Sequence, residues 1–104
     1  MTDAHTSFVA AVRHAAQTFK LPKYKKEYRR LSPRFWVAWL DLELGCECED
    51  WDKLTNTMIA AHHQLGAPGD FGYGTPCGDA LRNVYDTWRE LCQARKIRQE
   101  EPKS

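Results

Sequence analysis

The stretch SPRFWVAWLDLELG, from Ser32 to Gly45, decides the fold class of this chain. A Ser-Pro pair is typical of a helix start, because Ser caps free backbone amides and Pro fits the first helical position. Gly45 is typical of a helix end. The second half alternates in polarity, as a strand would, but the start and stop signals favour a helix. Because its first turns are apolar nearly all round, we expect this helix at the centre of the domain.

Three further helices are predicted from similar signals. Upstream, segment 7–20 has apolar residues at helical spacing, with Thr6 or Ser7 as its cap. Downstream, the third helix begins near Asp50 and closes at Gly66. The glycine-rich loop APGDFGYGT ends at Thr75. The fourth helix opens at Thr75-Pro76 and ends near Gln99.

The composition agrees with a single globular domain. Of the 104 residues, 42% are hydrophobic and 12% are aromatic, and four are Trp. A chain of this length makes one domain rather than two. We therefore predict an all-α, four-helix bundle-like domain over residues 1–104, with a glycine-rich loop between helices three and four and a short flexible tail at 100–104.

The sequence contains no recognisable export or membrane signal. Asp3 and other polar residues interrupt the N-terminal segment, which therefore lacks the basic and then apolar pattern of a signal peptide. The longest apolar run, Phe35 to Leu40, is far shorter than the roughly 20 residues that cross a bilayer. We expect a cytoplasmic protein without membrane contact, whose four Cys are thiols or metal ligands rather than a disulfide framework.

The net charge of +1 conceals two oppositely charged segments. Segment 20–34 carries seven basic residues and one acid, whereas segment 41–52 carries six acids and no base. Three of these acids lie where the third helix begins, and carboxylates there favour the positive end of the helix dipole. The same acids would repel phosphates, so a helix-turn-helix that reads DNA through the third helix is not expected.

The basic segment is the candidate binding site. Its Lys and Arg side chains would neutralise phosphates, and its tyrosines would stack on exposed bases. The simpler alternative is a solvated connector whose Tyr rings pack on the core. The candidate residues for binding a partner or a polyanion are Lys20, Lys23, Tyr24, Lys25, Lys26, Tyr28, Arg29, Arg30 and Arg34.

Aromatic residues supply a second kind of candidate contact. Phe71 and Tyr73 lie in the glycine-rich loop and either dock back onto the bundle or form a small binding loop. The loop lacks the Gly-Lys-Ser/Thr ending of a phosphate loop. Trp36 and Trp39 lie three residues apart on one helix, where they are either core residues or hot spots of an interface.

Metal and thiol chemistry has weak support. The candidate ligands are Cys46, Cys48, His62 and Cys77, but a Cys-x-Cys pair is not the usual spacing of a zinc knuckle and no second pair matches it. Cys77 lies in the first turn of a predicted helix, where thiolate is favoured, and His62 or His63 would be its base. No third group to orient that base can be named, so we predict no metal, no cofactor and no catalytic residue.

These observations favour a non-enzymatic accessory, regulatory or inhibitor protein that acts through protein–protein contacts. Separated charges and numerous Trp residues suit a protein partner of matched charge, or self-association. The first alternative is a nucleic-acid-binding protein that uses segment 20–34. The second is a metal- or thiol-dependent protein.

Overall fold

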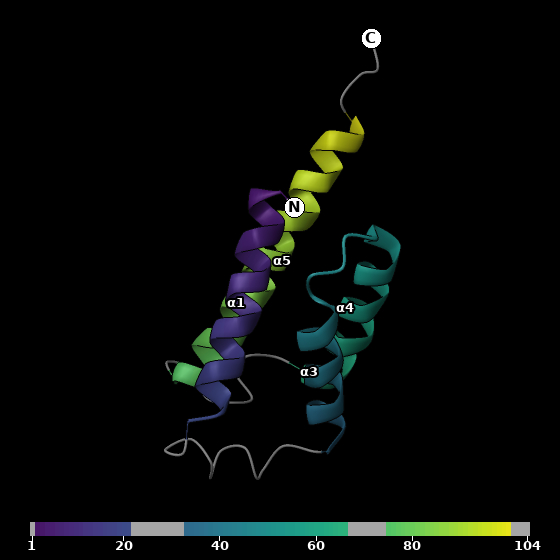
Figure 1. Cartoon of the computed structure of the whole chain (residues 1–104). Coiled ribbons are helices and arrows are strands. Elements are labelled where there is room, and N and C mark those ends of the chain that lie inside the picture. Colours follow the sequence, from purple (N-terminus) through teal and green to yellow (C-terminus); the bar gives the residue numbers. More distant parts are fainter. Residues whose placement is uncertain (1, 22–32, 67–74, 101–104) are drawn as a thin grey trace.

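The computed structural model describes residues 2–21, 33–66 and 75–100, and the side chains of 97–100 lie outside this description. The described residues lie mainly in helices, which confirms the all-α prediction (Figure 1). In chain order the helices are α1 (Asp3–Phe19), α3 (Pro33–Gly45), α4 (Trp51–Leu65) and α5 (Pro76–Glu100). None of the described helices is both long enough and apolar enough to span a bilayer.

Local signals fix most of the helix ends. The Asp50 carboxylate accepts hydrogen bonds from the amides of Asp52 and Lys53, at 3.1 and 3.3 Å, and so caps α4. At the other end of α4, Gly66 adopts a φ of 71°, which suits glycine. The Thr75 hydroxyl accepts a hydrogen bond from the Gly78 amide at 3.1 Å and so caps α5. These three boundaries lie where the sequence predicts them.

The predicted start of α1 is wrong. The hydroxyl of Thr2, and not that of Thr6 or Ser7, caps the helix by accepting a hydrogen bond from the His5 amide at 3.2 Å. The helix therefore begins at Asp3, before the apolar pattern begins. The added first turn brings His5 into the protein interior, where 7% of its surface is exposed.

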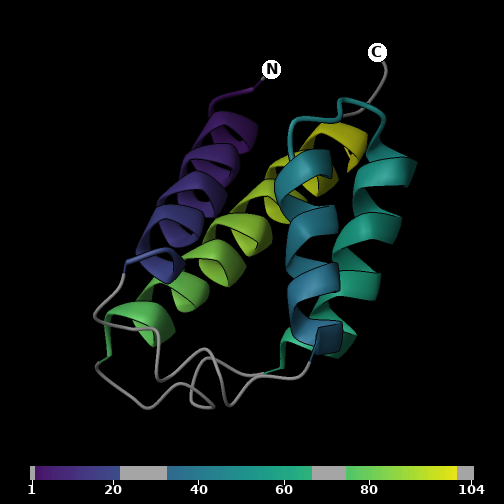
Figure 2. The same cartoon turned by 60° about the horizontal axis from the view of Figure 1, so that its bottom comes forward.

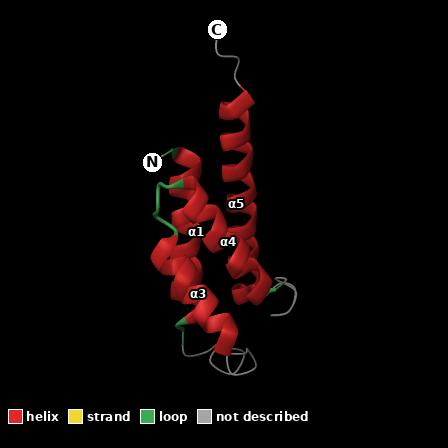
Figure 3. Cartoon of the chain, turned by 90° about the vertical axis from the view of Figure 1, so that its right-hand side faces the viewer, coloured by secondary structure: helices red, strands yellow, loops and turns green. Residues whose placement is uncertain are grey.

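The four helices form two pairs. Helix α1 packs along α5, α3 packs along α4, and α1 makes a smaller contact with α3. Figure 1 shows the two pairs next to each other, and Figures 2 and 3 show the same arrangement from other sides. Helix α5 is the longest of the four, and its last turns project beyond the end of α1 (Figure 1).

Helices α1 and α5 supply most of the fully buried core. Six side chains on these two helices are 0% exposed: Phe8, Val12, Ala15, Cys77, Leu81 and Val84. Helix α3 supplies a narrower stripe to the same core, which consists of Phe35, Ala38, Trp39 and Leu42.

The prediction that α3 is central is wrong. Val37, Leu40 and Leu44 are 62%, 52% and 76% exposed, so a large part of its apolar surface faces outward. Among the described elements, α4 packs extensively against α3 and α1 makes a smaller contact with it. An apolar circumference therefore identifies a helix that can be buried, but the number of neighbours decides whether it is.

Aromatic rings join the two pairs at two places. The ring of Phe19 on α1 lies 4.8 Å from that of Trp39 and 6.1 Å from that of Trp36, both on α3. Elsewhere Trp51 of α4 stacks on Trp88 of α5, with 5.4 Å between ring centroids and 15° between planes. Trp39 is a core residue and the other three Trp are partly buried, so the tryptophans serve chiefly at the junctions between helices.

Candidate functional site

A groove of about 940 Å³ runs between α3 and α4. Its apolar part consists of Val37, Ala38 and Leu44 from α3 and of Ala60 and Ala61 from α4. The groove is also lined by two charged residues of α3, Arg34 and Asp41, and by Pro33, Gly45, Asn56, Thr57 and Gln64. Most of the surface that lines the groove is apolar.

Helical spacing explains why these residues of α3 lie together. Arg34, Val37, Asp41 and Leu44 follow one another at intervals of three or four residues, which places them on one face of the helix. The other side of α3 carries the core residues Phe35, Trp39 and Leu42, and Ala38 lies between the two sides. Helix α3 thus has two apolar sides, one in the core and one in the groove.

Small residues bring the two helices close and keep the groove open. A Cβ atom at Gly45 would lie 3.4 Å from Cγ2 of Thr57, so the C-terminal end of α3 lies directly against α4. Ala38, Ala60 and Ala61 have short side chains, which leave the space between the helices unfilled. Space of this kind suits a side chain or a helix from outside the chain.

The rim of the groove carries two opposite charges. Arg34 and Asp41 are both exposed and both line the groove. Neither forms an ion pair with another residue that the structure describes. Because they are separated by seven positions of one helix, they lie about 10 Å apart along its axis.

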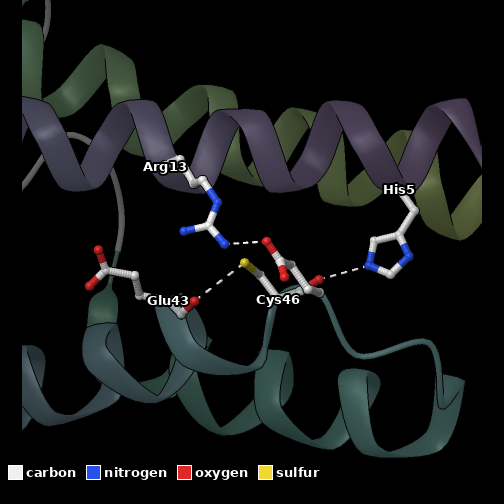
Figure 4. A network of polar contacts seen from close by, with 5 residues as sticks. His5, Arg13, Glu43 and Cys46 are labelled. Atoms are coloured by element: carbon white, nitrogen blue, oxygen red, sulfur yellow. Dashed lines mark hydrogen bonds and ion pairs between the residues drawn. The ribbon is translucent and has the colours of Figure 1, made fainter. Parts of the chain in front are cut away.

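Polar contacts fasten the α3–α4 connection to α1 (Figure 4). Nε2 of the buried His5 donates a hydrogen bond to the carbonyl oxygen of Cys46 at 2.7 Å. Arg13 forms an exposed ion pair with Glu47, and Nζ of Lys20 lies 3.5 Å from the Glu43 carboxylate. Two acids of segment 41–52 therefore have basic partners within the chain.

Most of the sequence-predicted binding residues cannot be placed. Lys20 and Arg34 are exposed and lie at the end of α1 and the start of α3. The candidates between them, Lys23, Tyr24, Lys25, Lys26, Tyr28, Arg29 and Arg30, lie outside the described residues, as do Phe71 and Tyr73. Whether the basic segment forms one patch therefore stays a prediction.

The burial and contacts of the thiol and histidine candidates bear on whether they share a site. Among the described residues, no group of three or more His, Cys, Asp or Glu side chains is arranged to hold a metal ion. Cys46 is buried, its thiol donates a hydrogen bond to the Glu43 carbonyl at 3.5 Å, and burial raises its pKa. Cys77 is 0% exposed, and the His62 ring packs against Tyr85 at 4.9 Å. Both of these thiols are therefore buried in the described structure.

The groove residues Val37 and Leu44 were not singled out by the sequence analysis. Their signal is the three- and four-residue spacing of Arg34, Val37, Asp41 and Leu44, which predicts a second exposed face of α3. Because α3 was expected at the centre of the domain, all of its apolar residues were assigned to the core and no exposed face was predicted.

Comparison with known proteins adds no assignment, since no protein family, curated protein or solved structure matches the chain.

Proposed function

We propose that the chain is a small, non-enzymatic accessory protein that acts through protein–protein contacts made by its α3–α4 groove. The observation that carries this proposal is the exposed apolar lining of the groove, where Val37 and Leu44 are 62% and 76% exposed. Exposed apolar surface with a polar rim is typical of sites that another protein covers. Grooves between two helices also recur as receptors for a third, amphipathic helix.

The proposal is tested with a matched pair of variants on α3. Val37 lines the groove, whereas Leu40 is similarly exposed, at 52%, and does not line it. The full chain is crosslinked to its neighbours in an extract of the cells that produce it. Val37→Glu should abolish crosslinking to the partner protein, and Leu40→Glu should retain it. Mass spectrometry identifies the crosslinked proteins, other copies of the chain included. Circular dichroism verifies that both variants fold.

An identical set of crosslinked proteins for wild type, Val37→Glu and Leu40→Glu would contradict the proposal. The prediction requires that the charge introduced into the groove disrupts a contact, because a buried, unpaired carboxylate is strongly unfavourable in an apolar interface.

A second candidate function is polyanion binding by segment 20–34, which has seven basic residues and one acid. The exposure of Lys20 and Arg34 at the two ends of this segment supports it. Binding of labelled oligonucleotides, followed by fluorescence anisotropy, should weaken steeply with salt. Replacing Lys25, Lys26, Arg29 and Arg30 by Glu should abolish it. Equal binding by wild type and this variant would contradict the second candidate.

A further inference from the structure

We propose that the groove is occupied by a second copy of this chain, with the two α3 helices packed antiparallel about a two-fold axis. This inference rests on the proposed function, because it names the partner of the same groove. Its basis is the arrangement of charge and apolar surface on the exposed face of α3.

The charges on this face are complementary to themselves. Arg34 lies near the start of α3, Asp41 lies seven residues later, and both line the groove. If a second α3 runs antiparallel about the midpoint between these two residues, Arg34 of each copy faces Asp41 of the other. One two-fold operation thus forms two equivalent ion pairs, as a self-complementary interface requires.

The apolar residues fit the same axis. Val37 and Ala38 are the two residues at the midpoint between Arg34 and Asp41, and both line the groove. They therefore lie at the centre of the proposed interface, with the ion pairs on either side. An apolar centre with a charged rim is the usual composition of a protein interface.

The small side chains that line the groove also leave space for a second helix. Helix α3 has 13 residues, which corresponds to a length of roughly 20 Å. The short side chains of Ala60 and Ala61 on α4 line the groove beside α3. They allow a neighbouring helix to approach to the usual interaxial distance of about 8–10 Å.

The alternative orientation of the two helices is unfavourable. A parallel pairing in register would place Arg34 against Arg34 and Asp41 against Asp41. Like charges opposite each other at an interface are repulsive and select against that arrangement. A protein partner of unrelated sequence would need its own acid and base at a matching separation, whereas a second copy carries both.

The test exchanges the two charges one at a time and then together. Sedimentation equilibrium over a concentration series should show that the wild-type chain dimerises. Arg34→Asp and Asp41→Arg should each weaken dimerisation by at least about tenfold, because each places like charges together twice. The double variant should restore it. An equimolar mixture of the two single variants should form a heterodimer, since all charges then face opposite ones.

Arg82→Asp is the matched control, because Arg82 is exposed on α5 and does not line the groove. This variant should dimerise like the wild type. Circular dichroism shows whether each variant is folded, and the mixture of single variants remains informative if the double variant is not.

Three results would overturn the inference. One is a wild-type chain that stays monomeric at every concentration. Another is a dimer that both single variants retain, which places the interface elsewhere. The third is a pair of single variants that fail to dimerise when mixed. If the chain is monomeric but Val37→Glu loses a crosslinked protein of different sequence, the second copy is excluded and the proposed function stands. If Val37→Glu keeps both dimerisation and crosslinking to other proteins, the inference and the proposed function both fail.

Discussion

The α1–α5 pair and the α3–α4 pair use their apolar residues differently. In the first pair the large apolar side chains are directed inward, and Phe8, Val12, Leu81 and Val84 are completely buried. In the second pair the core stripe is accompanied by apolar residues that face outward, of which Leu44 is the most exposed at 76%. The two pairs have similar secondary structure but different surfaces.

This difference indicates that one helix pair chiefly stabilises the fold and the other is available for contact with a partner. Burial of apolar area is the dominant favourable contribution to folding, so the α1–α5 pair should carry most of the stability of the domain. Apolar residues that stay exposed contribute little to folding but are available to a partner. The α3–α4 groove is therefore the part of the described surface where substitutions should alter contacts without unfolding the chain.

The largest expected effect lies in the α1–α5 pair. Phe8 is 0% exposed and its ring lies 5.3 Å from that of Trp88. Phe8→Ala should reduce the free energy of unfolding by about 3–5 kcal/mol, because it removes buried area and leaves a cavity. Leu44→Ala, in the groove, should change the unfolding free energy of the monomer by no more than about 0.5 kcal/mol. Chemical denaturation measures both, and similar losses in the two variants would break the comparison between the pairs.

A smaller effect is expected where the two pairs are joined. His5→Leu removes the buried hydrogen bond to the Cys46 carbonyl, which is 2.7 Å long. An unsatisfied buried carbonyl costs about 1–3 kcal/mol, so the unfolding free energy should fall by that amount. His14→Leu is the control, because His14 lies exposed on the same helix. If both variants lose the same unfolding free energy, the hydrogen bond does not stabilise the contact between α1 and the α3–α4 connection.

The smallest effect is expected for the exposed ion pair at the same junction. Arg13 and Glu47 are 52% and 55% exposed, so water and salt screen their attraction. A double-mutant cycle with Arg13→Ala and Glu47→Ala should give a coupling energy that is smaller than the effect of His5→Leu and decreases in high salt. A larger, salt-insensitive coupling would show that the junction depends on this ion pair more than on His5.

Most helix boundaries follow from short-range chemistry and were predictable. Asp50, Gly66 and Thr75 act through neighbours within four residues, so the sequence alone identifies their roles. The start of α1 was not predictable in this way. Thr2 and Thr6 are both good caps, and the apolar pattern begins only at Phe8, so spacing favoured the later one.

One residue of the predicted binding segment, Arg34, lines the groove, whereas Val37 and Leu44 were not predicted as contact residues. The sequence directed attention to Trp36, Trp39 and the charged segment 20–34 as contact residues. Trp39 proves to be buried at 4% exposure, and Trp36 packs edge-on against Phe19. The groove lies on another face of α3, because the positions of α1 and α4 determine which apolar side of this helix is left uncovered.

By itself the sequence determines that the chain is helical and where most helices begin and end, because capping and helical periodicity act over a few residues. It also determines that Arg34, Val37, Asp41 and Leu44 share one face. Only the tertiary structure decides that this face is open and that the acids at 43 and 47 are paired with α1. Those outcomes depend on packing between segments far apart in the chain, which local patterns do not specify.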